Sequence, residues 1–359
     1  METFSVKFSA GSIELNAMVT AYDHNRQFKV EMVTNEPSPI LLMRSSKGLW
    51  SVIQRGERNI TDKEFIVLQE AIEAQMCQFY GVESMLVLTD FSEEALNACK
   101  YAVALSAQLN TTRLTLYHSY EPIMIPPTAF APVTEGFVET PDESLEKITK
   151  IKNELEPLAP AHTKIDVRTD ERSLLAAVNM LVQQLHSGLV VTGITGKSKL
   201  ERVLIGSNTL NLARECLAPL LIVPPQAVYK KIETVVFACD LRQVLETTPV
   251  FAIKTFIDVL GAKLLILNVD RSGAYFDTNT ILEMSDLHLL WDDERPEYHY
   301  TDHEDTAIGI MEFSNEHHAD LVITVPKIYG FFESIFHRSL TKKLAYHSHL
   351  PLLLFREEL

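Results

Sequence analysis

MLVLTD, residues 85–90, is a short apolar run that ends in Asp and leads into a helical pattern over residues 92–109. TVVFACD, residues 234–240, has the same form, and a helical pattern follows it as far as Leu260. Short apolar runs bounded by turns are typical of buried strands, and an apolar period of 3.6 residues is typical of helices. The chain therefore contains the same strand-to-helix unit twice.

The spacing around these units indicates a repeat much longer than one strand and one helix. The matched intervals are 28 residues from Asp90 to His118 and from Asp240 to Asn268, and 30 residues from Leu189 to Pro219 and from Leu321 to Pro351. The stretch between the matched intervals differs in length, because the first copy carries a Pro-rich segment at 121–137. We interpret the sequence as two tandem copies of one α/β unit.

Within each copy, short β-branched runs alternate with helical patterns. This alternation predicts a Rossmann-like α/β fold, in which a parallel sheet is covered by helices on both faces. Ligands of such sheets bind beyond the carboxyl ends of the strands, where the strand order reverses. Asp90, Ser119 and Gly193 all stand at the ends of predicted strands, so we expect them to meet at one edge of the sheet.

The beginning of the chain follows another pattern. Five stretches alternate apolar and polar residues between turn signals, which predicts a small antiparallel β-meander. Residues 62–79 then form one amphipathic helical pattern, with Thr61 as the N-cap and Glu64 completing a capping box. The expected parts are a β-meander plus helix of unknown role at 1–82 and α/β repeats at 83–226 and 230–359.

The composition is that of a soluble, acidic protein. The net charge is −16, and an acidic surface repels phosphate backbones, so we expect no nucleic-acid partner. No apolar run approaches the ~18 residues of a membrane span, and no signal peptide is evident, so we expect no membrane association and a cytoplasmic location. The four cysteines form no CxxC pair and are interpreted as reduced structural thiols.

The segment GITGKSKLERVLIGSNT, residues 193–209, carries the clearest functional signal. Its informative residues are Gly193 and Gly196 after a predicted strand, then Gly206 and Ser207 at the start of a helix predicted over about 207–216. Glycines let a backbone approach an anion closely, and the N–H groups at a helix N-terminus attract phosphate. The segment is not a P-loop, because that motif needs a glycine where Val191 stands.

With a strand, a Gly-x2-Gly-x9-Gly-Ser pattern and a helix, this segment resembles the nucleotide loop of the universal stress protein family. TDFSEEALNACKYAVALSAQL, residues 89–109, is similar to that family's first strand-to-helix turn, and APLLIVP, residues 218–224, to its last strand. The resemblance covers 83–226 strongly and 230–359 weakly, and it leaves 1–82 unexplained. It implies an adenine-nucleotide-binding stress-response or regulatory protein with an adenine nucleotide α-hydrolase-like fold.

The resemblance also implies a set of nucleotide contacts. Asp90, with Thr89 beside it, would lie near adenine and ribose, and Ser119 would offer backbone contacts to adenine. The residues that would hold ribose and phosphates are Gly193, Gly196, Gly206, Ser207 and Asn208. Asn208 stands where the family often has a hydroxyl residue. The implied ligand is ATP, with AMP and ADP as alternatives and Mg²⁺ as an optional companion.

The second copy departs from the glycine pattern. When the copies are aligned on Ser207 and Ser339, the three glycines are replaced by Val325, Ile328 and Arg338. Side chains there would occupy the space left for phosphate, so we predict that the second repeat does not bind nucleotide in the same way. The family's dimers pair through their last strands, so the resemblance implies an intramolecular pseudo-dimer; a homodimer and an unidentified protein partner stay open.

Each signal also has a plainer interpretation. Gly193 and Gly196 also suit a tight strand-to-helix connection with no ligand, and Asp90 suits the start of a helix. The late histidines, near Asp302, Glu304 and Asp305, are His288, His299, His303, His317, His318, His337, His347 and His349. They match no rigid metal-ligand spacing, so we favour a solvated, pH-sensitive surface over a metal site.

No arrangement typical of catalysis is evident, neither a Ser-His-Asp or Cys-His set nor paired carboxylates. We therefore expect nucleotide binding with at most slow ATP hydrolysis. The alternative hypothesis is a ligand-free, pseudo-symmetric scaffold that acts through protein–protein interaction. An ATP-using transferase is a third and weaker hypothesis.

Overall fold

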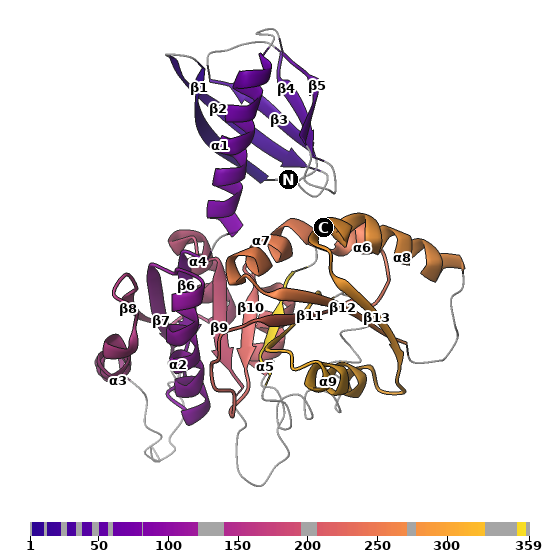
Figure 1. Ribbon diagram of the computed structural model, residues 1–359. Coiled ribbons are helices and arrows are strands. Elements are labelled where there is room, and N and C mark those ends of the chain that lie inside the picture. Colours follow the sequence, from indigo (N-terminus) through magenta and orange to yellow (C-terminus); the bar gives the residue numbers. More distant parts are fainter. Residues whose placement is uncertain are drawn as a thin grey trace, which may run out of the picture.

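The computed structural model describes residues 2–10, 13–22, 27–33, 38–44, 50–56, 60–80, 82–120, 140–194, 207–270, 278–326 and 350–356. These residues form two sheets, one five-stranded and one ten-stranded (Figure 1). The first sheet is built from the start of the chain, and the second from the two repeats.

The first sheet is an antiparallel meander in the order β1-β2-β3-β4-β5, with one helix packed on its apolar face. The elements are β1 Glu2–Ala10, β2 Ile13–Tyr22, β3 Gln27–Met32, β4 Ile40–Arg44, β5 Trp50–Gln54 and α1 Asp62–Tyr80. The predicted capping box is confirmed. The Glu64 N–H donates to the Thr61 hydroxyl at 3.3 Å, and the Thr61 N–H donates to the Glu64 carboxylate at 3.0 Å.

The second sheet has the order β13-β12-β11-β14-β15-β10-β9-β6-β7-β8, which divides into two halves of equal topology. The elements of the first half are β6 Ser84–Leu88, α2 Glu93–Gln108, β7 Arg113–Ser119, α3 Pro141–Leu155, the 3₁₀ turn η1 Glu156–Leu158, β8 Lys164–Asp170, α4 Leu174–Leu185, β9 Leu189–Gly193, α5 Ser207–Glu215 and β10 Leu220–Val223. Its strands are parallel and lie in the spatial order third, second, first, fourth, fifth.

The second half repeats this order. Its elements are β11 Thr234–Ala238, α6 Val244–Thr247, α7 Val250–Leu260, β12 Lys263–Asp270, α8 Thr278–Trp291, the 3₁₀ turn η2 Asp292–Glu294, β13 Glu297–Asp302, α9 Thr306–Glu316, β14 Leu321–Thr324 and β15 Leu352–Leu354. The halves join where β10 pairs antiparallel with β15, with Leu221 opposite Leu353. The predicted fold class, two tandem parallel-sheet repeats after a β-meander, is confirmed.

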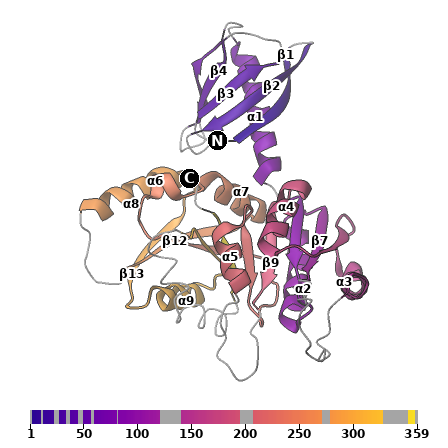
Figure 2. The same cartoon turned by 180° about the vertical axis from the view of Figure 1, so that it is seen from behind.

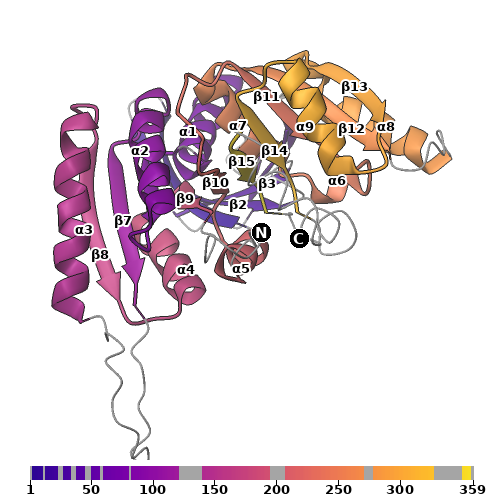
Figure 3. The same ribbon diagram turned by 90° about the horizontal axis from the view of Figure 1, so that it is seen from below.

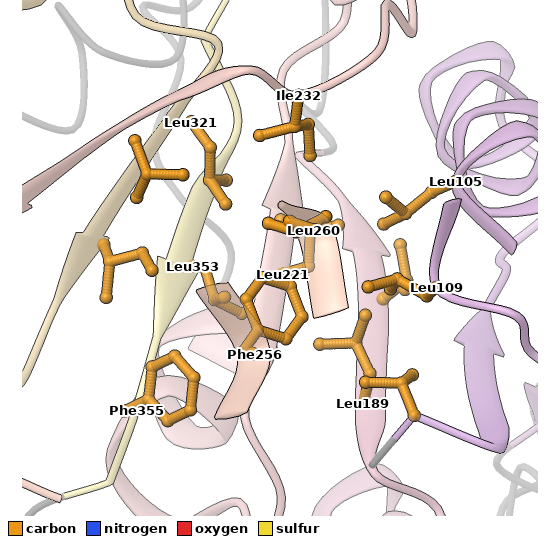
Figure 4. Packing of buried hydrophobic residues seen from close by; sticks show 14 of the residues in the cluster. Leu105, Leu109, Leu189, Leu221, Ile232, Phe256, Leu260, Leu321, Leu353 and Phe355 are labelled. Atoms are coloured by element: carbon orange, nitrogen blue, oxygen red, sulfur yellow. The ribbon is translucent and has the colours of Figure 1, made fainter. Parts of the chain in front are cut away.

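Helices cover both faces of the long sheet (Figures 2 and 3). One apolar cluster joins the two repeats on the face of α2, α3, α7 and α8, and Figure 4 shows its centre. Leu105 and Leu189 of the first repeat lie in the same cluster as Phe256 and Leu353 of the second. The repeats therefore share one core across the β10–β15 junction.

One predicted helix differs from the structure. The sequence pattern suggests a single helix from Asp240 to Leu260, whereas the chain forms the short α6 and then α7. The break lies at Thr248, whose backbone is extended, and at Pro249. Proline has no N–H and disfavours a helical conformation at the residue before it, which accounts for the break.

Within the described part of the chain, no helix combines the length and the apolar character that crossing a membrane requires.

Candidate functional site

The candidate site lies where the strand order of the first repeat reverses. β6 and β9, its first and fourth strands, are parallel neighbours, so their carboxyl ends lie at the same edge of the sheet. β6 leads directly into Thr89 and Asp90, and β9 ends at Gly193. Ser119 ends β7, the other neighbour of β6. The structure thus brings together, at one edge, these four residues that the sequence analysis singled out.

Asp90 shapes the start of α2. Its Oδ1 accepts hydrogen bonds from the Ser92 N–H at 3.1 Å and from the Ser92 hydroxyl at 2.6 Å. The Ser92 hydroxyl oxygen in turn accepts a bond from the Ala95 N–H at 3.2 Å, as the N-cap of α2. Phe91 has a φ of 66°, which is uncommon for a residue other than glycine. The side chain of Asp90 is exposed, so one carboxylate both orders this turn and faces solvent.

Thr89 is buried beneath this turn and fixes its backbone. The Thr89 N–H donates to the Tyr117 carbonyl at 2.9 Å, and the Thr89 hydroxyl accepts a bond from the Phe91 N–H at 3.1 Å. The Thr89 carbonyl lies 2.8 Å from Nδ1 of His118, so that nitrogen carries the proton. These bonds hold the peptide that presents Asp90.

Gly193 packs against the first turn of α2. A Cβ atom at this position would lie 2.7 Å from the Glu94 carbonyl oxygen and 3.1 Å from the Ala95 backbone nitrogen. The first of these distances is too short for real Cβ atoms, so glycine is required whether or not a ligand binds. The same contact brings the loop after β9 against the helix that Asp90 begins.

The Ser119 side chain points to β8. Its hydroxyl donates a hydrogen bond to the Arg172 carbonyl, in the turn after β8. Next to it, the Tyr117 hydroxyl donates to the Asp170 carboxylate at 2.9 Å, and burial together with this carboxylate raises the pKa of Tyr117. The Ser119 hydroxyl is therefore used within the protein, and its backbone is the part that the resemblance assigns to adenine.

The remaining candidate residues lie on the loop after β9 and on α5. Gly196 and Gly206 fall outside the described residues, as does the side chain of Ser207. α5 begins at Ser207, as predicted, and Asn208 is exposed in its first turn. Because α5 connects two parallel neighbours, β9 and β10, we infer that its N-terminus lies toward the carboxyl ends of the strands.

Several residues of this region were not identified from the sequence. Ser92 had a local signal, because an Asp-x-Ser spacing before a helix is typical of a capping turn. The rings of Phe91 and His118 lie 4.2 Å apart, and Nζ of Lys147 lies 5.4 Å from the centre of the Phe91 ring. Lys147 is on α3, and nothing in the local sequence gives the packing of α3 over Phe91.

Cys99, on α2, lies close enough to Asp90 to sense its charge. Burial raises the pKa of the Cys99 thiol from 9.0 to about 12, and the negative charge of Asp90 adds to the rise. A thiol with this pKa stays protonated at neutral pH and is a poor nucleophile. Cys99 is therefore a structural residue.

The second repeat has the same turn with other side chains. Leu241 corresponds to Phe91 and has a φ of 51°. The Asn268 side chain donates to the Cys239 carbonyl at 2.9 Å, where the first repeat has the bond from His118 to Thr89. The two repeats therefore share individual hydrogen bonds at equivalent positions, in addition to the same order of strands.

In the second repeat, a carboxylate accepts hydrogen bonds from the backbone amides that follow β11. Glu283 of α8 accepts hydrogen bonds from the Gln243 N–H and the Val244 N–H, both at 2.8 Å. Val325 is buried directly after β14, while Ile328 and Arg338 lie outside the described residues. In the described residues the second repeat therefore directs an acidic side chain to the edge where the first repeat has Asp90 and Gly193.

The late histidines make protein contacts. The His299 ring lies 4.8 Å from the Phe313 ring and 5.0 Å from the His317 ring, and the His288 ring lies 3.9 Å from the Tyr298 ring at a tilt of 35°. Among the described residues, no three His, Cys, Asp or Glu side chains are grouped so that they could hold a metal ion. His337, His347 and His349 fall outside that part of the chain.

Comparisons with known proteins bear on both repeats. Residues 81–224 match the model of the universal stress protein family. A search of curated proteins finds no match to the sequence. A universal stress protein from Archaeoglobus fulgidus DSM 4304 is similar in structure, with 15% sequence identity and a TM-score of 0.54, over 78% of this chain and 98% of that one.

Two further structures are similar. A putative universal stress protein from Pseudomonas aeruginosa UCBPP-PA14 has 11% identity and a TM-score of 0.51, over 78% of this chain and 95% of its own. A universal stress protein family protein from Arabidopsis thaliana, solved with AMP bound, has 12% identity and a TM-score of 0.27, over 39% of this chain and 89% of its own. The likeness to the archaeal and Pseudomonas proteins extends well beyond the residues that the family model matches. Residues 81–224 thus belong to the universal stress protein family, and the chain has the fold of a tandem universal stress protein preceded by an additional N-terminal module.

Proposed function

We propose that the first repeat binds one adenine nucleotide at the carboxyl ends of β6 and β9, and that the protein acts as a nucleotide-responsive stress or regulatory protein. ATP is the proposed ligand, with AMP and ADP as alternatives and Mg²⁺ as a companion of the phosphates. The proposed contact residues are Thr89, Asp90, Ser119, Gly193, Gly196, Gly206, Ser207 and Asn208. We further propose the division into a module at 1–82 and repeats at 83–226 and 230–359.

The observation that supports this proposal most is the position of Asp90 and Gly193 on adjacent strands at the reversal of the strand order. Crevices at such reversals are the usual ligand sites of parallel α/β sheets. Asp90 supplies a carboxylate able to accept bonds from ribose hydroxyls, and α5 supplies N–H groups able to donate to phosphate.

The second repeat is proposed to pair with the first and not to bind nucleotide in the same way. The Glu283 carboxylate already uses the Gln243 and Val244 amides. Val325 also stands where the first repeat has Gly193, and its side chain is buried directly after β14. The β10–β15 pairing supports the internal pairing of the repeats.

Nucleotide extracted from the purified full-length protein, identified by mass spectrometry, tests the proposal first. Thermal unfolding with ATP or AMP tests it quantitatively, because a ligand present at 100 times its Kd stabilises the folded state by about 2.7 kcal/mol. We expect a bound adenine nucleotide or a rise in Tm. Absence of both, at millimolar nucleotide and with Mg²⁺, would contradict the proposal.

The variant Asn208→Asp separates binding from stability. Asn208 is exposed, and an acidic residue in the first turn of a helix stabilises it slightly. The new charge repels phosphate, so we expect weaker nucleotide binding with no loss of stability. Asn153→Asp is the matched control, because Asn153 is exposed near the end of α3 and α3 runs away from the carboxyl ends of the strands. If the two variants bind nucleotide with equal affinity, the phosphates do not lie near Asn208.

A ligand-free scaffold is the second candidate function. It is favoured by the contact of Gly193 with Glu94 and by the bonds of Asp90 to Ser92, because the fold alone accounts for both. Under this hypothesis the protein contains no nucleotide after purification, and residues 1–82 retain a defined protein partner.

A further inference from the structure

We propose that α2 and α7 form a mechanical relay that couples the first repeat's candidate site to the N-terminal module, and this inference rests on the proposed function for its ligand. The relay has three junctions. They lie at the start of α2, between the end of α2 and the end of α7, and between the start of α7 and the core of the five-stranded sheet.

The first junction ties α2 to both loops of the candidate site. Asp90 after β6 binds Ser92, the N-cap of α2. Gly193 after β9 lies directly against the Glu94 carbonyl in the first turn. A ligand that enters between these two loops therefore acts on groups that are both fixed to the beginning of one helix. α2 has 16 residues, which is a length of about 24 Å at 1.5 Å per residue.

The second junction is a single side chain, Gln108, in the last turn of α2. Its Nε2 donates to the Ile232 carbonyl at 2.8 Å and to the Leu260 carbonyl at 2.9 Å. Its Oε1 accepts from the Tyr229 hydroxyl at 2.8 Å and from the Ile232 N–H at 2.9 Å. Both donors and both acceptor positions of the amide are thus used, and every partner lies in the segment between β10 and β11 or at the end of α7.

Further contacts join α2 to the same segment between β10 and β11. The Asn97 side chain donates to the Pro224 carbonyl at 3.2 Å and to the Ala227 carbonyl at 3.0 Å. Tyr101 packs edge-on against Tyr229 with ring centres 5.3 Å apart. One face of α2 therefore contacts the segment between β10 and β11 along much of the length of the helix.

The third junction joins α7 to the N-terminal module. Leu260, which receives the bond from Gln108, is the last residue of α7, and Phe251 is near its start. Phe251 packs against the apolar core between the meander and α1. Figure 1 shows α7 lying below the five-stranded sheet, beside the lower end of α1. Two rigid helices thus connect the candidate site with a module whose role the universal stress protein fold does not explain.

The first experiment needs no ligand and compares two lost N-caps by hydrogen exchange of the full-length protein. Ser92→Ala removes the cap of α2, and Thr140→Ala removes the cap of α3, a helix of the same repeat that packs on β7, β8 and α2. We expect Ser92→Ala to speed exchange in α7 and in residues 62–72 of α1 by about fivefold, the effect of losing an N-cap. We expect Thr140→Ala to leave both segments unchanged. Equal effects of the two variants would overturn the relay.

The second experiment adds ATP. In the wild type we expect slower exchange around Asp90, in α7 and in α1. In Gln108→Leu we expect the change to stop at α2, and Gln184→Leu, at an exposed position of α4, is the matched control. Phe251→Ala is the milder variant should Gln108→Leu fail to fold, and it should lose only the response of α1.

The outcomes separate the two proposals. Slower exchange around Asp90 with no change in α7 would overturn the relay and leave nucleotide binding intact. No effect of ATP anywhere, together with a selective effect of Ser92→Ala, would overturn nucleotide binding and support the relay.

Discussion

Asp90 and Gly193 each serve the fold at the place where a ligand is proposed to bind. Asp90 orders the cap of α2, and Gly193 allows β9 to approach the first turn of the same helix. Their positions could be predicted because each ends an apolar run. The contact of Gly193 with Glu94 could not, because it depends on how α2 packs over β9. Substitutions at either residue therefore alter stability as well as binding.

Gly193→Ala should destabilise the protein even when no ligand is present. The added Cβ would lie 2.7 Å from the Glu94 carbonyl oxygen, and overpacking of this kind costs about 1–3 kcal/mol. Urea unfolding with and without ATP measures this cost. A variant as stable as the wild type in the absence of nucleotide would show that β9 and α2 do not pack as described.

Stability should fall at alkaline pH, in part because of Cys99. Burial raises the pKa of this thiol from 9.0 to about 12, so between these values the unfolded chain releases a proton that the folded chain keeps. Unfolding is then favoured as the pH rises, by about 1.4 kcal/mol per pH unit for this group. Urea unfolding at pH 7.5 and at pH 10 should show a smaller loss for Cys99→Ala than for the wild type. The same loss in both would contradict the burial of the thiol.

Individual elements followed local sequence signals closely. The capping box at Thr61 and the start of α5 at Ser207 were predicted because caps and glycines act over three or four residues. The break between α6 and α7 also has a local cause in Pro249, yet the apolar period runs through it and suggested a single helix. The role of Lys147 on α3 had no local signal, since it arises from the packing of one helix on another element.

Strand β15 should be essential to both repeats. Leu353 is fully buried in the shared core and lies opposite Leu221 across the β10–β15 pair. Leu353→Ala should lower the free energy of unfolding by about 2–5 kcal/mol. Leu352→Ala, one residue earlier and only partly buried, should cost less. Chemical denaturation compares the two, and the reverse ranking would contradict the pairing.

At the scale of the whole molecule, two equal spacings were enough to predict the duplication, and the equal strand orders of the two halves confirm it. Pairing through the last strands followed from the family resemblance, and the β10–β15 ladder bears it out. The packing of the N-terminal module against α7 was not predicted. It depends on Phe251, which in the sequence is one apolar residue among many in a helix.

The stoichiometry of nucleotide binding tests the central claim most directly. Isothermal titration of the full-length protein with ATP, and separately with AMP, counts the sites in solution. One nucleotide per chain is the predicted result, because Val325, Ile328 and Arg338 replace the three glycines of the first repeat in the sequence of the second. Two per chain would contradict the assignment of the second repeat, and no binding of either nucleotide would contradict the site itself.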